Sequence, residues 1–341
     1  MNHTKYIDAK VLIAILLFSF AFWGISYTAD WESYSYAFEH QNFTRDAAFE
    51  WLSNFCNERG WGFVALYRFH IVLMGTLYAV LYKMLKLNPI KFVLLTLLLG
   101  YVGLGNQIRY YVAFPLTIIA CLQLYSKKPQ PFVCSILLQM VSMYFHSTTI
   151  ILYLSFFFAH YFLRKYNSTK KIIIIAAANV LIYYIIYKSN WLVDEQYEAY
   201  KGQDKISSLQ GGIFNLTPAF IAMYFVWKIK KVCLNTTNCI CNNNCTFILT
   251  LITATLPLIF LSCYIQILGS RIIMALLPLY FGLFSQTRLY SNNHLCHAIS
   301  QKAISITLLY FIIWRFCVPY MFGINAQQLA ELTMMLESYK L

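Results

Sequence analysis

The chain has 341 residues, of which 60% are hydrophobic and 18% are aromatic, while only 11% carry a charged side chain. A soluble domain of this length carries roughly a quarter charged residues, and its core could not bury so much apolar surface. The composition therefore excludes an ordinary soluble protein and predicts an all-α, polytopic bundle of transmembrane helices.

Apolar stretches long enough to cross a bilayer recur along the whole chain. No Ala-x-Ala cleavage site follows the first stretch, so we expect it to be retained rather than removed as a signal peptide. Eleven spans are expected, at residues 11–29, 62–82, 91–105, 108–125, 132–147, 148–163, 172–188, 213–228, 246–267, 272–286 and 303–322. Some of these are short and meet a neighbour at a polar turn, which is typical of broken or re-entrant helices that line a cavity: 91–105, 132–147 and 272–286.

Basic residues are distributed unevenly among the segments that join these spans. With the N-terminus in the cytoplasm, most of the 26 Lys and Arg residues fall in short cytoplasmic segments, and nearly all of the 13 acidic residues fall elsewhere. Cytoplasmic loops of membrane proteins carry this excess of positive charge. The net charge of +13 is therefore a sign of topology and not of a nucleic-acid-binding surface, and the C-terminus is expected outside.

The segments expected outside include two loops long enough to fold, residues 30–61 and 189–212. We expect the chain to form a single integral membrane domain over residues 1–341, with these two loops as its extracytoplasmic parts. The outer tail at 323–341 is expected to form an amphipathic helix, because apolar side chains recur there at helical spacing: Leu329, Leu332, Met335 and Leu336.

Polar groups at the outer ends of the spans are the candidate functional residues, because ionisable groups at membrane depth are costly and are usually kept for a task. Gln107 and Arg109 lie at the turn between the third and fourth spans. The guanidinium fork suits a phosphate or a carboxylate, and the alternative is an arginine that reaches lipid headgroups. His146 lies at the turn between the fifth and sixth spans and suits a general base, or a structural role at the interface.

Three further groups share this outward position. Arg271 follows Gly-Ser between the ninth and tenth spans, with the same two interpretations as Arg109. Asp30 and Glu32 form an Asp-x-Glu pair after the first span, which suits either a divalent cation or a solvated start of a loop. Arg68 lies deeper in the second span and requires a wet cavity or an acidic partner, for which the candidates are Asp30, Glu50 and Glu58.

Other clusters predict no site. The Cys and His residues between 233 and 297 include no Cys-x-x-Cys pair, so no metal site is predicted there. Neither a P-loop nor a Rossmann glycine pattern occurs, so no nucleotide cofactor is predicted.

The order of these patches resembles the EpsG-like and Wzy-type polymerases of bacterial surface polysaccharide. The resemblance runs from about residue 27 to 286, and it departs from the pattern at Tyr110 and Tyr111, where the family often has Gln or a small residue. It rests on Asp30 with Tyr34, on Glu58 to Arg68 at the start of the second span, on Gln107 to Ala113, on Phe145-His146-Ser147, and on Arg271.

The resemblance implies an enzyme at the periplasmic face of the bacterial inner membrane that polymerises oligosaccharide repeat units carried on undecaprenyl diphosphate. No cofactor or metal is implied. Arg109 and Arg271 would stabilise the leaving diphosphate. His146 would be the first candidate for the base that accepts a proton from the acceptor hydroxyl, with Asp30 or Glu58 as alternatives. The substrate-binding residues would be Asp30, Tyr34, Glu58, Arg68 and Gln107.

The aromatic side chains of the stretch 31–63 offer surfaces on which sugar rings stack, namely Trp31, Tyr34, Tyr36, Trp51 and Trp61. Expected partners are the lipid-linked oligosaccharide and the lipid bilayer, with a polysaccharide chain-length regulator as a candidate and no nucleic acid. Alternative functions are another polyprenyl-phosphosugar-dependent glycosyltransferase, in which Asp30 and Glu32 hold a metal, an O-antigen ligase, and a transporter or flippase. A transporter predicts charged residues through the full membrane depth, whereas the charged side chains here gather at the outer end.

Overall fold

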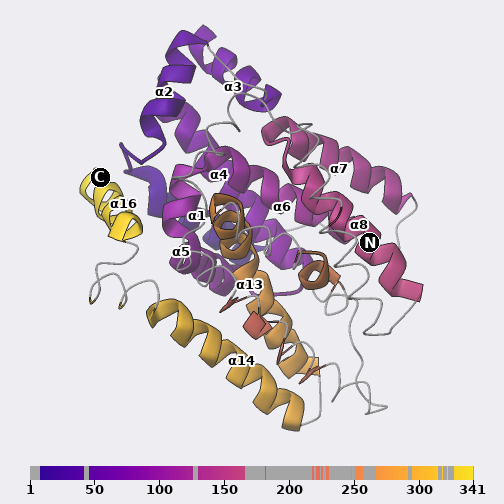
Figure 1. Cartoon of the computed structure of the whole chain (residues 1–341). Coiled ribbons are helices and arrows are strands. Elements are labelled where there is room, and N and C mark those ends of the chain that lie inside the picture. Colours follow the sequence, from indigo (N-terminus) through magenta and orange to yellow (C-terminus); the bar gives the residue numbers. More distant parts are fainter. Residues whose placement is uncertain are drawn as a thin grey trace. The chain divides into compact units, whose positions relative to one another are not determined.

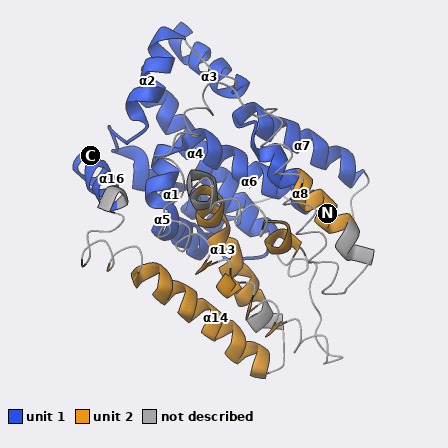
Figure 2. Cartoon of the chain, viewed as in Figure 1, with its two compact units in different colours: residues 1–153, 319–341 blue, residues 154–318 orange. Residues whose placement is uncertain are grey.

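The computed structural model describes residues 8–41, 46–125, 130–165, 266–290, 294–313 and 326–340, with short pieces at 181, within 217–229 and 247–255, and at 317 and 321. Every regular element within these ranges is a helix, which confirms the predicted all-α class (Figure 1). The chain divides into two compact units, residues 1–153 with 319–341, and residues 154–318 (Figure 2).

Four helices form the centre of the first unit, and α1 packs on α4 and α5 while α6 packs on α4. Aromatic side chains fill the interfaces: the rings of Phe22 and Tyr101 stack at 4.6 Å, and those of Phe18 and Tyr78 lie 6.1 Å apart. Almost every side chain of α6 is buried, so this helix is the central element of the unit. The four helices are α1 (Ala9–Trp23), α4 (Phe63–Met84), α5 (Pro89–Asn106) and α6 (Ile108–Gln123).

The polar contacts at the helix ends show which ends lie together. Asp8 caps the start of α1 and forms an ion pair with Lys83 in the last turn of α4. At the opposite end of α1, the backbone N–H of Ala29 donates to the side chain of Asn106, the last residue of α5. The turn between α1 and α2 therefore lies beside the turn between α5 and α6, at the end of the bundle away from Asp8.

Among the described residues, three helices are long and apolar enough to cross a membrane, namely α4, α5 and α14 (His294–Ile312). Shorter apolar helices are α1, α6, α7 (Pro131–Phe145) and the apolar parts of α8 (Thr149–Lys165) and α13 (Gln266–Tyr290). Exposed apolar side chains such as Leu137 and Tyr144 of α7 present surface that suits lipid. The protein is thus a multi-pass helical membrane protein, while the total of eleven spans is not confirmed.

Several predicted boundaries are wrong. α1 ends at Trp23 rather than near 29, because the chain turns at Gly24. α5 has 18 residues and is long enough to cross a membrane, so the prediction of a short span at 91–105 is wrong. The apolar segments Pro131–Phe145 and Arg271–Gln286 are short, as predicted, although the second lies within the longer helix α13. α14 begins at His294 and not near 303, since its polar first turns contain no helix breaker. The span predicted at 172–188 and the loop at 189–212 lie outside the described residues, apart from Leu181.

The first predicted outer loop folds into two helices, α2 (Trp31–His40) and α3 (Ala47–Glu58). Trp31 turns inward, with its ring 4.8 Å from that of Phe63 and 5.1 Å from that of Tyr67. α3 packs on α4 and α7, and Phe49 is among the side chains that it buries. The hairpin formed by α2 and α3 is therefore attached to the helical bundle by apolar contacts.

The predicted amphipathic helix near the end of the sequence is confirmed as α16 (Ala326–Glu337), which packs on α5 in the first unit. Met335 is fully buried, but Leu336 is 56% exposed, so the prediction that it shares the buried face is wrong. Consecutive residues lie about 100° apart around a helix, which turns Leu336 away from the face that holds Met335.

Candidate functional site

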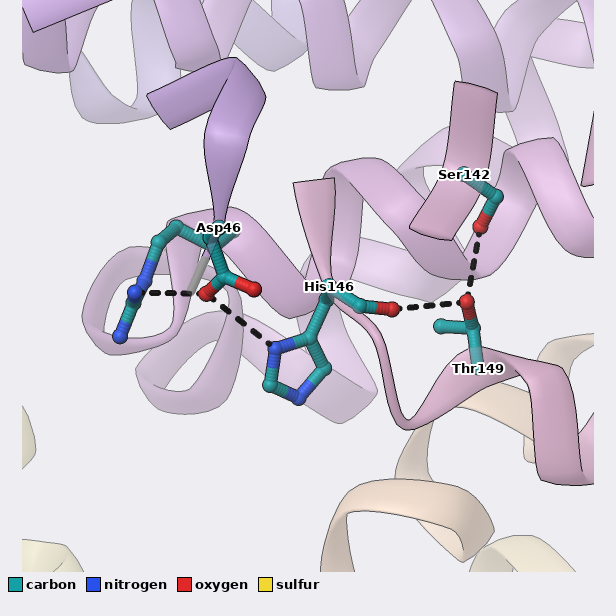
Figure 3. Close-up of polar contacts among 5 residues, drawn as sticks. Asp46, Ser142, His146 and Thr149 are labelled. Carbon is teal, nitrogen blue, oxygen red and sulfur yellow. Dashed lines mark hydrogen bonds and ion pairs between the residues drawn. The ribbon is translucent and has the colours of Figure 1, made fainter. Parts of the chain in front are cut away.

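Three ionisable side chains from different helix ends meet in the first unit (Figure 3). Oδ2 of Asp46 accepts a hydrogen bond from Nη1 of Arg109 at 2.6 Å and lies 3.6 Å from Nδ1 of His146. The Asp46 side chain is only 7% exposed, while those of Arg109 and His146 are 25% and 19% exposed. The carboxylate is therefore the buried centre of the cluster, and the two basic groups reach from it toward the surface.

Local backbone structure sets the position of each member. Asp46 precedes α3, and its carbonyl accepts from the N–H groups of Phe49 and Glu50, but its side chain makes no capping hydrogen bond. The carboxylate is thus directed to Arg109 and not to its own helix. Arg109 is the second residue of α6, directly after the break at Gln107, where φ is −109° and ψ is 56°.

His146 ends α7 in an extended conformation with φ −160° and ψ 107°. Its N–H donates to the carbonyl of Ser142 at 2.9 Å, and its own carbonyl accepts from Thr149 Oγ1 at 2.8 Å. Both backbone groups are thereby satisfied, which fixes the residue and leaves the ring facing Asp46 (Figure 3). The ring also meets that of Tyr110 edge to face, with centroids 5.5 Å apart.

Hydroxyl groups beside His146 connect α6, α7 and α8. Ser142 Oγ bonds the carbonyl of Ala113 at 2.7 Å, Thr117 Oγ1 at 2.8 Å and Thr149 Oγ1 at 3.0 Å. These groups are buried, where each hydrogen bond is stronger and each missing one is costly. The network therefore fixes the turn that carries His146 relative to α6, the helix that carries Arg109.

Aromatic rings enclose Arg109. Its guanidinium carbon lies 5.0 Å from the ring centroid of Tyr34 and 5.4 Å from that of Phe49, within the range of cation–π attraction. The carboxylates of Asp46 and Asp30 attract its charge, and the Tyr34 phenol is placed to hydrogen bond with it. The rings limit the access of water, so charge interactions at this position are stronger than on an open surface.

Some polar atoms of this region are buried without a hydrogen-bond partner, namely Nε of Arg109, Nδ1 of His146 and Oε1 of Gln107. Buried polar groups in folded proteins are usually paired, so unpaired ones require an explanation. Nδ1 of His146 faces Oδ2 of Asp46 at 3.6 Å, so Nε of Arg109 and Oε1 of Gln107 are the two atoms whose position suits contact with a polar substrate.

The predicted residues divide into those that the structure brings to this cluster and those that it does not. Arg109 and His146 are in it, Tyr34 covers Arg109, Gln107 sits at the adjoining break, and Asp30 acts on Arg109 from the start of α2.

The other predicted residues lie elsewhere. Glu58 is exposed at the end of α3, beside a shallow hollow lined also by Gln41, Asn54 and Asn57. Within the described part of the chain, Arg68 has no acidic partner: Nε donates to the carbonyl of Trp23 at 3.1 Å, and the guanidinium lies 4.7 Å over the Trp23 ring. The predicted acidic partners of Arg68 are therefore wrong, since a carbonyl and an indole ring take that role.

Arg271 belongs to the second unit. It lies inside the continuous helix α13, so the prediction of a turn at Gly269-Ser270-Arg271 is wrong. Gly and Ser weaken a helix but do not end one that apolar residues continue on both sides. Nε of Arg271 is buried without a hydrogen-bond partner, a feature that it shares with Arg109.

Asp46 is the member that the sequence analysis missed. Its signal is an aspartate directly before the amphipathic stretch Ala47–Glu58, which is a helix N-cap position. That signal predicts a structural cap, and nothing local shows that the side chain turns instead to a residue 63 positions further along the chain.

Together these observations define a multi-pass helical membrane protein with a carboxylate, a guanidinium and an imidazole gathered where its helices turn. A carboxylate beside an imidazole orients that ring as a base, and a partly open guanidinium binds a developing anion. The model of the EpsG family matches residues 10–331, and the chain belongs to the EpsG family. No curated protein and no solved structure matches it.

Proposed function

We propose that this protein polymerises lipid-linked oligosaccharide repeat units, as O-antigen and exopolysaccharide polymerases do. Membership of the EpsG family supports a polysaccharide polymerase-type, glycosyltransferase-like function. The observation that supports the specific chemistry best is the cluster in which Asp46 lies between Arg109 and His146.

The reaction would transfer the growing glycan from undecaprenyl diphosphate to a hydroxyl of the next lipid-linked unit. The bond between the anomeric carbon and the diphosphate oxygen breaks, and the diphosphate leaves with the electron pair. A new bond forms between the anomeric carbon and the acceptor oxygen, and the hydroxyl proton goes to a base. The protein must therefore supply a base and a positive group, which are the two functions that the cluster offers.

Within the cluster, His146 is the proposed base. With its Nδ1–H directed at Asp46, its Nε2 carries the lone pair that accepts the proton. Asp46 then holds the ring in this tautomer and stabilises the positive charge that the ring acquires. Arg109 is the proposed electrostatic partner of the leaving diphosphate, because one edge of its guanidinium is held by Asp46 and its side chain remains a quarter exposed.

Further groups complete the proposed site. Tyr34, Gln107 and Asp30 are proposed to contact the substrate beside Arg109, and Glu58 and Arg68 to contact the glycan further along its path. Arg271 is proposed as a second cation for the diphosphate, because it too has a buried guanidinium nitrogen without a partner. Neither a metal nor another cofactor is part of this proposal.

The proposed location is the bacterial inner membrane, with the N-terminus in the cytoplasm, the C-terminus in the periplasm and the cluster at the periplasmic face. The uneven distribution of Lys and Arg supports this orientation. The ion pair of Asp8 with Lys83 supports the assignment of these two residues to one side, and the cluster lies at turns on the other. A chain-length regulator remains a proposed partner.

The test is a gel of surface polysaccharide from a deletion strain that carries the wild-type gene, Arg109→Ala or His146→Ala, at matched protein levels. Arg59→Ala and His40→Ala are matched controls, because Arg59 stacks on Phe55 and His40 on Tyr36 at the exposed hairpin.

We expect the deletion to leave single repeats, and the wild type and both controls to restore the ladder of long chains. The two site variants should stay at one repeat. Loss of even the single repeat in the deletion strain would indicate a transferase or flippase instead, and full-length but unattached chains would indicate a ligase.

A further inference from the structure

The residues that follow α16 are held against the rest of the first unit by a series of hydrogen bonds. Ser338 Oγ donates to the carbonyl of Tyr27 at 3.0 Å, and the carbonyl of Ser338 accepts from Ser26 Oγ at 2.7 Å. The N–H of Lys340 donates to the carbonyl of Gly24 at 2.7 Å. The segment is thus fixed to the turn that joins α1 to α2.

Asn106 connects this segment to the rest of the unit. Its Oδ1 accepts from the N–H of Ala29 at 3.2 Å, and its Nδ2 donates to Oε2 of Glu331 at 3.2 Å. The residue is only 6% exposed. Because an N–H requires an acceptor and a carboxylate requires a donor, the two partners together dictate the orientation of the amide.

The two ends of this bridge lead directly into the candidate site. Asn106 is followed by the break at Gln107 and then by Arg109 at the start of α6. Ala29 is followed by Asp30, whose carbonyl accepts from the N–H of Tyr34 at 3.1 Å in the first turn of α2. The amide of Asn106 therefore fixes the two chain segments from which Arg109 and Tyr34 reach each other.

We propose that Glu331 is a positioning residue of the candidate site, which acts through Asn106 to hold Arg109 against Tyr34 and Asp46. Nη1 of Arg109 is already bound to Asp46 at 2.6 Å, so a small shift of the turn at Gln107 breaks a short contact. A carboxylate acceptor makes the hydrogen bond to Asn106 stronger than a neutral one does. The effect on polymer formation rests on the proposed function, whereas the effect on Arg109 does not.

A reversal of the hydrogen bond tests the proposal. In Asn106→Asp, two carboxylates face each other and the donor is lost, so Arg109 is released. In the double variant Asn106→Asp with Glu331→Gln, the glutamine amide donates to the new aspartate, which still accepts from Ala29. Glu337→Gln is the matched control, because it removes one carboxylate from an exposed position of the same helix.

Two readouts are made on each protein in full length. The first is the rate at which phenylglyoxal modifies Arg109 in the detergent-purified protein, measured by mass spectrometry relative to the exposed Arg59. The second is polymer length and amount in the deletion strain. We expect Asn106→Asp to raise the modification rate of Arg109 about tenfold and to lower the amount of polymer about tenfold. The double variant should return both quantities to within about threefold of wild type.

The outcomes separate the two proposals. Loss in Asn106→Asp with recovery in the double variant supports the positioning role, because a purely local defect at 106 would not be repaired by a change 225 positions away. Unchanged Arg109 reactivity in Asn106→Asp, or no recovery in the double variant, overturns it. If the wild-type gene itself restores no polymer, the proposed function fails, and Arg109 reactivity alone then decides whether Glu331 positions that side chain.

Discussion

Replacing Asp46 by asparagine removes one charge from the centre of the cluster and changes its shape little. Asparagine still accepts a hydrogen bond from Arg109 through its carbonyl oxygen. However, it neither stabilises a protonated His146 nor balances the guanidinium charge. We therefore expect the protein to fold and to lose most of its polymerising activity.

The magnitude follows from the geometry. Oδ2 of Asp46 lies 3.6 Å from Nδ1 of His146, whose ring becomes positively charged only when it accepts the proton, so the two opposite charges are about 4 Å apart in the transition state. At an effective dielectric constant near 20, the attraction at that separation is about 4 kcal/mol. Water reaches the partly exposed imidazole and screens a share of this attraction, which leaves about 3 kcal/mol. A loss of this size in the transition state lowers the rate roughly 100-fold.

The assay measures the initial rate of polymer formation by purified protein in lipid vesicles from a single lipid-linked repeat unit. Glu50→Gln is the matched control, since it makes the same change of charge four residues further along, at an exposed position in the first turn of α3. The reasoning is refuted if Asp46→Asn keeps more than about a third of the wild-type rate, or if Glu50→Gln loses as much.

Three further predictions concern packing and reactivity in the first unit. Ser142→Ala should lower the free energy of unfolding by about 1–3 kcal/mol, because the buried hydroxyls of Thr117 and Thr149 lose a partner. Thermal melts measure this, and Ser35→Ala, which removes only a solvent-exposed hydrogen bond, should melt like wild type. Gly24→Ala should detach the segment after α16, because a Cβ there overlaps the carbonyl oxygen of Lys340, and limited proteolysis should then cut near α16 faster. Gly62→Ala, whose Cβ meets nothing within 4 Å, should leave that cleavage unchanged. Burial raises the pKa of the Cys56 thiol above its ordinary value. At pH 8 less of it is thiolate than for a free cysteine, so maleimide should label it slowly, at a rate that rises with pH. Labelling of native Cys56 as fast as in the denatured protein would contradict this prediction.

Composition and local pattern were sufficient to predict the class of fold and two members of the cluster. Arg109 and His146 each stand at a polar break between apolar runs, and such breaks in a membrane protein are visible in the sequence itself. Their proximity was only implied by a shared side of the membrane, because no local pattern specifies which helix ends touch.

The errors have physical causes as well. Asp46 was missed since its partner lies 63 positions away and its local signal is that of a helix cap. The turn expected at Arg271 was wrong because Gly269 and Ser270 lie inside a helix that tertiary packing sustains. Arg68 was expected to require an acidic partner. Instead it donates to the carbonyl of Trp23, which has no acceptor role within α1 because it lies in the last turn of that helix.

The composition of the first unit from two distant stretches of chain has a consequence for biogenesis. Residues 319–341 are synthesised only after the whole of 154–318, yet they complete the unit that begins with α1. Until they are synthesised, Asn106 lacks its hydrogen bond to Glu331, and the carbonyl of Gly24 lacks the hydrogen bond from Lys340. A nascent chain arrested anywhere in the second unit would thus lack these contacts and expose a surface that membrane proteases can recognise.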